Sequence, residues 1–248
     1  MSLQTGWNHF PFEEISLAPQ NFSYSLKGLR IVQLSDLHLI KDIDINYLET
    51  LVAKINGLNP DFVVITGDIL QTSATKLHKH FRAFKVLAAP AYYVTGNHDI
   101  VYGPKPLRDM FFDNGVICLD NKIETLTIKG APLQLVGLSD RYSFARGIKR
   151  PIKELFTKID PNISTILLAH QPKDILHVDK FRIDIQLSGH THGEQIYPFN
   201  IIVKYFQPYF SGLYSRNKTL LYVTRGLEYW GPKVRYRVPS EIPVFTIN

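Results

Sequence analysis

Seven side chains in this sequence have the chemistry and the spacing of metal ligands. Each lies just after an apolar, strand-like run, and together they are Asp36, His38, Asp68, Asn97, His170, His190 and His192. Two carboxylates, four imidazoles and one amide are too many ligands for one ion, so the set predicts two divalent ions, roughly 3.5–4 Å apart. Nitrogen and oxygen donors without a thiolate suit manganese, iron or zinc and disfavour a cysteine-type structural zinc site.

The spacing within two of these motifs is typical of side chains that share one ion. In Asp36-Leu37-His38 the outer residues are two positions apart, so an extended backbone would project both to one side and Leu37 to the other. The pair His190 and His192 repeats this spacing. Glycine residues beside the motifs let the backbone turn sharply and approach an ion or a phosphate closely.

Each motif alone has an ordinary structural interpretation. A lone Asp-x-His is usually a turn or a surface pair, Gly-Asp is usually a turn, and Asn-His-Asp after a glycine is typical of a helix cap. A single histidine such as His170 is more often a buried core residue than a ligand. The ordered series after successive strand-like runs favours the functional interpretation, because it is hard to reach by chance.

The elements that must hold these residues alternate between strands and helices in the first half of the chain. Apolar runs predict strands at 29–34, 62–65 and 91–94, and helical spacing predicts helices over 45–55, 77–84 and 107–112. Later runs predict paired strands at 124–128 and 133–138, a short helix at 152–159, and strands at 166–168, 183–187, 220–224 and 244–247. This pattern predicts an α/β fold of two sheets, with antiparallel hairpins added to the early alternation.

Size and composition favour one α/β domain. The 248 residues are 45% hydrophobic, enough to bury a large core, and we expect a single domain over 1–248. The ligand motifs would occupy 29–195, and 196–248 would complete the sheet and the rim of the cleft. The formal net charge of +6 favours an anionic partner, such as a phosphate ester, a nucleic acid or an anionic membrane surface.

Hydropathy and cysteine content also limit the location of the protein. No stretch has the roughly 20 apolar residues of a transmembrane helix, and the first 19 residues lack the pattern of a secretory signal. We therefore expect a cytoplasmic protein or one peripheral to the membrane, with an anchor lost from the N-terminus as the alternative. The one cysteine, Cys118, lies in an apolar run, and we expect it to be a small buried core residue.

The sequence resembles the calcineurin-like metallophosphoesterase superfamily in an ordered set of motifs. They are Asp36-x-His38, Gly67-Asp68, Gly96-Asn97-His98-Asp99, His170 and Gly189-His190-x-His192. Flanking stretches at 168–172, 187–193 and 224–232 resemble its bacterial YkuE/YaeI-type branch. The resemblance implies the metallo-dependent phosphatase fold, a four-layer α/β/β/α sandwich of two mixed sheets flanked by helices. It also implies hydrolysis of a phosphodiester, a pyrophosphate or a phosphomonoester.

The superfamily pattern implies two metal sites that share one carboxylate. The shared, bridging residue would be Asp68. The first ion would also bind Asp36, His38 and His192, and the second would also bind Asn97, His170 and His190.

The same pattern implies roles for two residues that follow Asn97. His98 would donate a hydrogen bond or a proton to the leaving-group oxygen, while a metal-bridging hydroxide attacks phosphorus in line. Asp99 would orient a neighbouring residue rather than bind metal.

Two departures from the family pattern narrow the expectation. The protein-phosphatase branch continues Gly-Asp with a further Asp-Arg pair, whereas Ile69-Leu70-Gln71 follows here, which argues against a phosphoprotein phosphatase. Where the YkuE-type branch usually has Gly-Gly-Gln after the histidine pair, this chain has Gly193-Glu194-Gln195. Glu194 adds an anion beside the site, and we expect it to face solvent rather than to weaken phosphate binding.

Further candidates for substrate contact lie outside the ligand set. Four rim residues are candidates for substrate binding, namely Asp140, Arg141, Arg146 and Arg225. The segment 197–214 is rich in aromatic residues and carries a lysine, as Tyr197, Phe199, Lys204, Tyr205, Phe206, Tyr209, Phe210 and Tyr214. We expect most of these aromatics to pack onto the sheet, with contact to substrate or to a membrane as the alternative.

Three alternatives to a general phosphoesterase stay open. Hydrolysis of a nucleotide-linked lipid precursor, as by a UDP-diacylglucosamine pyrophosphatase, would suit the aromatic and basic segment. A nuclease would need a dense basic stripe, which the +6 charge spread along the chain does not offer, so nucleic acid is the less favoured partner. A catalytically silent scaffold of the same fold usually lacks some ligands, whereas here every ligand position is filled.

Overall fold

Two mixed β-sheets pack face to face in this structure, a computed structural model that describes residues 10–178, 180–197, 208–231 and 234–248. The first sheet has the order β1 (Phe12–Leu17), β12 (Ile242–Ile247), β2 (Arg30–Leu34), β3 (Phe62–Ile65), β4 (Ala91–Tyr93) and β5 (Val116–Cys118). The second has the order β10 (Gly212–Arg216), β11 (Thr219–Val223), β9 (Ile185–Ser188), β8 (Ser164–Ala169), β7 (Ala131–Leu138) and β6 (Lys122–Ile128).

Parallel strands form the centre of each sheet, and antiparallel pairs lie toward the edges. In the first sheet β2, β3, β4 and β5 are parallel, with Val32 opposite Val63, while β12 runs antiparallel to β2. In the second sheet β7, β8, β9 and β11 are parallel, and the pairs β6·β7 and β10·β11 are antiparallel. The carboxyl ends of several central strands therefore meet at one end of the sandwich, as the sequence pattern requires.

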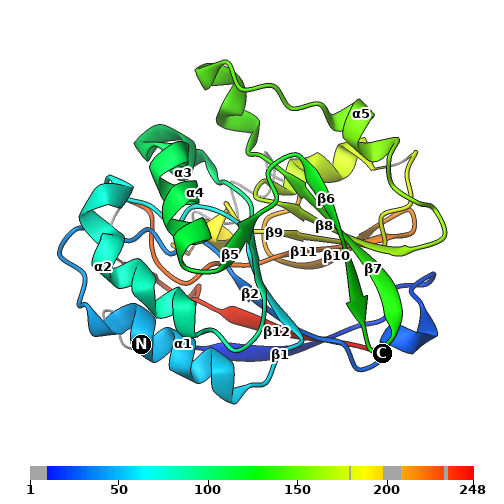
Figure 1. The fold of residues 1–248 in the computed structure, drawn as a ribbon, viewed down its shortest axis with the longest axis horizontal. Coiled ribbons are helices and arrows are strands. Elements are labelled where there is room, and N and C mark those ends of the chain that lie inside the picture. The colour runs from blue at the N-terminus through cyan, green and yellow to red at the C-terminus, as the bar shows by residue number, and fades with distance from the viewer. Residues whose placement is uncertain (1–9, 179, 198–207, 232–233) are drawn as a thin grey trace.

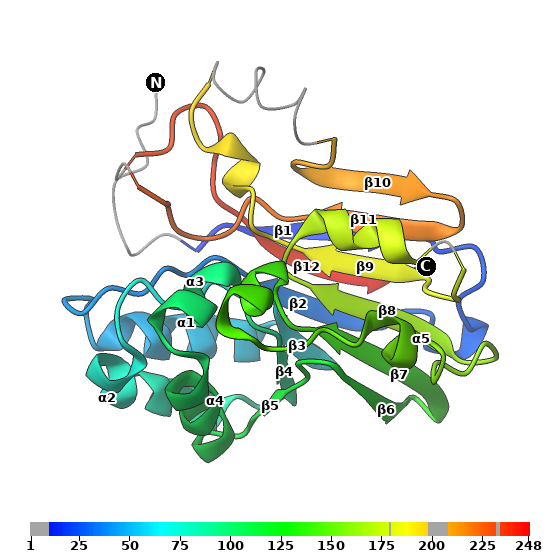
Figure 2. The same ribbon diagram turned by 90° about the horizontal axis from the view of Figure 1, so that it is seen from above.

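Helices cover the outer face of each sheet, which gives the predicted four layers (Figures 1 and 2). The first sheet is covered by α1 (Asn46–Gly57), α2 (His78–Phe81) and α4 (Pro104–Asp113), and α3 (Asn97–Tyr102) lies at its carboxyl edge. The second is covered by α5 (Ile152–Phe156) and the 3-10 turn η5 (Pro172–His177). The other 3-10 turns are η1 (Tyr24–Leu26), η2 (Ala74–Leu77), η3 (Arg82–Val86), η4 (Arg141–Arg146) and η6 (His192–Glu194).

Alternation along the strands divides the core into three apolar layers. Val63 packs under the helices of the first sheet, whereas its neighbour Val64 packs between the sheets against residues such as Leu168. On the far side, Leu167 packs against Phe156 of α5. A strand that is buried on both faces has a continuous run of apolar residues. For this reason β3 has the bounds that the sequence predicts. Among the described residues, no helix has the length and apolarity needed to cross a bilayer.

Several elements differ from the sequence prediction. The predicted helix at 77–84 is broken into η2, α2 and η3. The edge strands β1 and β10 were not predicted, because their alternating exposed residues give no apolar run. Cys118 is half-buried at the end of β5 and packs against the core rather than inside it.

A glycine in β7 marks the point where the edge of the first sheet meets the second. A Cβ added to Gly137 would lie 2.3 Å from the carbonyl oxygen of Leu119, just after β5. We expect Gly137→Ala to lower the free energy of unfolding by roughly 1–3 kcal/mol, because backbone rather than a flexible side chain must move. The matched control is Gly57→Ala at the end of α1, where nothing lies within 4 Å of the added Cβ and the change should be neutral or slightly stabilising. Urea unfolding of both variants measures this, and equal effects would contradict the interpretation.

Candidate metal centre

The predicted ligands come from loops at the carboxyl ends of both sheets. Asp36 and His38 follow β2, Asp68 follows β3, and Asn97 begins α3 after β4. The second sheet contributes the remaining three, with His170 after β8, and His190 and His192 after β9. Strand ends fix the position of a side chain well, so this arrangement can hold a precise cluster.

The loops that carry these residues are wound tightly rather than extended. Positive φ angles occur at five of the seven predicted ligands: Asp36 (55°), His38 (39°), Asp68 (53°), His190 (75°) and His192 (53°). The expectation of an extended Asp36-x-His38 segment was therefore wrong. Left-handed backbone is unfavourable for residues other than glycine, and such strain is typical of functional sites, where surrounding contacts hold it in place.

Two loops of the first sheet hold each other through their backbones. The amide of Asp36 donates to the Gly67 carbonyl at 3.0 Å, and the amide of His38 donates to the Asp68 carbonyl at 3.0 Å. Gly96 must be glycine for the next loop to approach, because an added Cβ would lie 2.2 Å from Oδ1 of Asp68. The carboxylate of Asp68 is thus fixed by close packing on two sides.

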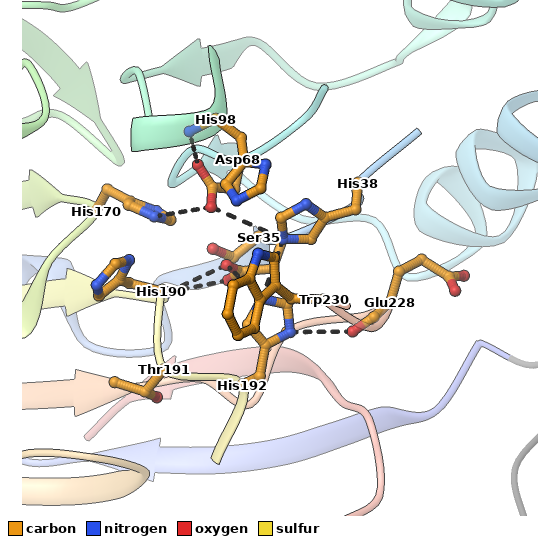
Figure 3. Close-up of polar contacts among 12 residues, drawn as sticks. Ser35, His38, Asp68, His98, His170, His190, Thr191, His192, Glu228 and Trp230 are labelled. Atoms are coloured by element: carbon orange, nitrogen blue, oxygen red, sulfur yellow. Dashed lines mark hydrogen bonds and ion pairs between the residues drawn. The ribbon is translucent and has the colours of Figure 1, made fainter. Parts of the chain in front are cut away.

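Imidazole nitrogens and carboxylate oxygens converge at the centre of the cluster (Figure 3). Nε2 of His38 lies 3.0 Å from Nε2 of His192, which in turn lies 3.5 Å from Oδ1 of Asp36. Oδ2 of Asp68 lies 3.7 Å from Nε2 of His38 and 3.3 Å from Nε2 of His170. Asp68 is therefore placed between the two halves of the cluster.

Among the described residues the donor atoms form three groups, of which two correspond to the predicted sites and the third joins His38, Asp68 and His98. Within each group one donor atom per residue lies within 4.8 Å of the others: Asp36, His38 and His192 form one group, and Asp68, His170 and His190 form another. Asn97 joins the second group, because its Oδ1 lies 3.2 Å from Nε2 of His170. The structure brings all seven predicted ligands together.

The outer nitrogens of three histidines have acceptor partners on the side away from the cluster. Nδ1 of His38 lies 3.0 Å from Oε1 of Gln71, Nδ1 of His170 lies 2.7 Å from the Thr66 carbonyl, and Nδ1 of His192 lies 3.2 Å from the Glu228 carbonyl. The Nδ1 atoms of His38 and His170 therefore donate their hydrogens outward, and the Nε2 atom of each ring faces the cluster. Lone pairs and carboxylates that face one another at such distances fit a cation between them.

The three outer partners were not found by sequence reasoning. Gln71 was considered only as a departure from the Asp-Arg pattern, although it lies three residues after Asp68 and its amide side chain is a suitable acceptor. Carbonyl groups such as those of Thr66 and Glu228 leave no sequence signal, because every residue has one.

Burial controls the protonation of the cluster. It lowers the pKa of His38 to about 4 and that of His190 to about 3, so both rings are neutral at pH 7, the form that binds metal. At Asp68 burial is the largest effect and raises the pKa, but the neighbouring His170, His38 and His98 together outweigh it, so the pKa falls. Burial lowers the pKa of His170, but Asp68, Asp36 and Asp140 together outweigh it and the pKa rises, so metal binding at His170 would displace a proton.

Two residues beside the ligands have contacts that define their positions. The amide of His98, in the first turn of α3, donates to Oδ1 of Asp68 at 2.8 Å, and its ring lies edge-on to that of His38 at 4.6 Å. The carboxylate of Asp99 accepts from the amides of Ile69, Leu70 and Gly96 and from the hydroxyl of Tyr93 at 2.8–3.1 Å. Asp99 thus ties the loop after β3 to the start of α3.

A cavity of about 620 Å³ opens beside the cluster. Predicted ligands and His98 line one side, and Thr191, Glu194, Gln195, Ile196 and Trp230 line the rest. Glu194 lines this cavity and is half-buried, so the expectation that it faces solvent was wrong. Among the described residues, the lining does not include Asp140, Arg141, Arg146 or Arg225.

Each of these four rim candidates makes polar contacts with residues that do not line the cavity. Asp140 is buried and accepts from the Gln171 amide, and Arg141 pairs with Asp174. Arg146 donates to the Val101 carbonyl, and Arg225 pairs with Glu13 and Glu241. Substrate binding by these four stays a prediction.

Part of the aromatic segment packs as expected. The rings of Tyr209 and Tyr214 meet edge-on at 5.3 Å and pack against the apolar layer outside the second sheet. Phe199, Lys204, Tyr205 and Phe206 lie outside the described residues, so contact of this segment with substrate or membrane stays a prediction.

The chain belongs to the calcineurin-like phosphoesterase family, whose model matches residues 29–194. A metallophosphoesterase of Campylobacter jejuni is 35% identical over 90% of this chain and 60% of its own length, so the chain spans about 60% of that relative. YkuE of Bacillus subtilis is 32% identical over 94% of this chain and 82% of its own. The predicted family and branch are confirmed.

Two further similar proteins align with most of the chain. The UDP-2,3-diacylglucosamine pyrophosphatase LpxG of Chlamydia trachomatis is 28% identical over 90% of this chain and 84% of its own. A solved dimetal phosphatase from Danio rerio aligns with a TM-score of 0.52 and 10% identity, over 89% of this chain and 99% of its own, which supports the fold alone.

The raised pKa of Asp36 predicts how the metal-free protein responds to pH. Burial, with a smaller contribution from Asp68, raises the pKa of Asp36 from 3.8 to about 6. A group with a raised folded pKa contributes stability at low pH that is lost as pH rises through that value. Without metal, the free energy of unfolding of Asp36→Asn minus that of the unsubstituted protein should therefore increase by about 2 kcal/mol from pH 4 to pH 8. Urea unfolding in EDTA at both pH values measures this, and a difference independent of pH would contradict it.

Proposed function

We propose that this chain is a two-metal phosphoesterase that hydrolyses a phosphodiester or a pyrophosphate. The observation that carries the proposal is the convergence of three histidine Nε2 atoms on two buried carboxylates. Asp36, His38 and His192 would hold one ion, and Asn97, His170 and His190 the other, with Asp68 shared. This donor set suits manganese, iron or zinc.

The ions, when bound, would lower the pKa of water and neutralise charge on the phosphoryl oxygens. The residues of the chain supply position and one hydrogen-bond donor. His98 lines the cavity beside Asp68, and burial lowers its pKa, so at pH 7 its ring is neutral and keeps one N–H. In this role His98 donates that hydrogen to the leaving-group oxygen, where negative charge develops.

Asp99 acts through the residues that it holds. Its carboxylate accepts from Ile69 in the loop after β3 and from Gly96 just before α3, so it sets the distance between Asp68 and His98. It is a positioning residue in this proposal and touches neither metal nor substrate.

Two features favour a diester or pyrophosphate over a phosphoprotein. Gln71 stands in the loop after Gly67-Asp68, where the protein-phosphatase branch has an Asp-Arg pair, and here it orients His38. The likeness to LpxG supports a pyrophosphate bond in a nucleotide-linked lipid as one such substrate.

Metal content tests the donor set directly. After reconstitution with manganese we expect two ions per chain, and only one tightly bound ion in His38→Ala and in His170→Ala, since each removes a ligand of a different site. Calorimetric titration with elemental analysis measures this. His78→Ala, which changes an exposed histidine at the start of α2, is the control and should keep both ions. Two tightly bound ions in either ligand variant would remove that histidine from the centre.

Turnover tests the role of His98. The manganese-loaded protein should hydrolyse bis(p-nitrophenyl) phosphate, and His98→Ala should lower kcat by about 100-fold or more while metal content stays normal. His78→Ala should match the unsubstituted protein. A His98→Ala variant of full activity would exclude His98 from the reaction, and an unsubstituted protein inactive on all phosphate esters would contradict the proposed function.

A further inference from the structure

The part of the cavity away from the predicted ligands, the outer compartment, has a lining of different character. Its lining there comes from Thr191, Glu194, Gln195, Ile196 and Trp230. A volume of about 620 Å³ is larger than a phosphate requires, so this compartment has room for part of a substrate beyond the phosphoryl group. The residues that line this compartment should therefore indicate which chemical groups that part of the substrate has.

Two of the three polar side chains in this compartment are already engaged. The hydroxyl of Thr191 donates to the Phe210 carbonyl. The Gln195 amide makes two hydrogen bonds to the backbone of Trp230: its Nε2 donates to the carbonyl at 2.7 Å, and its Oε1 accepts from the amide at 3.0 Å. These groups shape the wall and leave Glu194 as the polar group that faces the ligand.

The carboxylate of Glu194 has no hydrogen-bond or ion-pair partner in the parts of the chain that the structure describes, and only its backbone is hydrogen-bonded. Its carboxylate is half-buried and shares the cavity with Asp68, which already carries a negative charge. An anion at this place repels the phosphate group of a substrate unless the substrate brings a positive charge to it. This carboxylate is therefore suited to a cation on the ligand.

Trp230 supplies the second half of such a site. Trp230 is 56% exposed and lines the same cavity as His192, and both residues are drawn in Figure 3. The double hydrogen bond from Gln195 fixes the backbone that presents the ring. An indole face is the best aromatic partner for an ammonium group, and an aromatic face with a carboxylate is a common way to bind quaternary ammonium ions.

We propose that Glu194 and Trp230 form a subsite for an ammonium group, so that the preferred substrate is a zwitterionic phosphodiester of an amino alcohol. The inference rests on the proposed function, because the subsite adjoins the reacting phosphate. An acyl chain would suit Ile196 but would leave the carboxylate desolvated without a partner. A neutral planar group would stack on Trp230 but would gain nothing from the charge of Glu194.

Two chromogenic esters test the subsite in the manganese-loaded protein. p-Nitrophenyl phosphorylcholine carries a quaternary ammonium group, and bis(p-nitrophenyl) phosphate carries none. We expect Glu194→Gln to lower kcat/KM for the choline ester about tenfold and to change that for the other ester less than about twofold. Trp230→Leu should shift the ratio in the same direction. Glu154→Gln on α5, which removes a negative charge from an exposed site, is the control and should leave both values unchanged.

The outcomes separate the subsite from the catalytic proposal. Equal losses on both esters in Glu194→Gln, or no change on either, would overturn the ammonium subsite while the phosphoesterase proposal stands. Failure of the unsubstituted protein to hydrolyse either ester would overturn the proposed function and the subsite with it. Metal content and thermal midpoint verify folding, and Glu194→Gln alone decides the matter if Trp230→Leu does not fold.

Discussion

The arrangement of this molecule depends on an electrostatic conflict at its centre. Two imidazole Nε2 atoms, of His38 and His192, lie 3.0 Å apart, and the buried carboxylates of Asp36 and Asp68 lie beside them. Electron pairs held this close repel one another unless positive charge lies between them. The strained loops, the close glycine contacts and the outward hydrogen bonds all serve to maintain that unfavourable proximity.

The strands that precede the ligands could be predicted because each of these strands is buried on both faces. A strand such as β3 is a continuous apolar run that ends abruptly at a polar loop, and both features are visible in the sequence. Edge strands such as β1 expose every second residue and give a mixed pattern. The short helix α3 was indicated only by the cap-like Asn97-His98-Asp99 motif, because six residues are too few to show helical spacing.

The identity of the donors could be predicted, but their backbone conformation and supporting contacts could not. Residue type and order pointed to the seven ligands, whereas the left-handed turns at Asp36 and His38 depend on the pairing of two loops distant in sequence. Carbonyl partners such as Glu228 have no sequence signature. The same limit applies to Glu194, whose place in the cavity follows from the turn after β9 rather than from its neighbours in the chain.

The ligands are divided between two sheets that are otherwise joined mainly by apolar contact. Asp36 and Asp68 belong to one sheet, and His170 and His192 to the other. Ions held among them would cross-link the layers at one end of the sandwich, much as a covalent bridge would. The cohesion of the two halves would then vary with the supply of metal, by simple mass action. Scarcity of the ion would in that case shorten the lifetime of the folded chain as well as slow its chemistry.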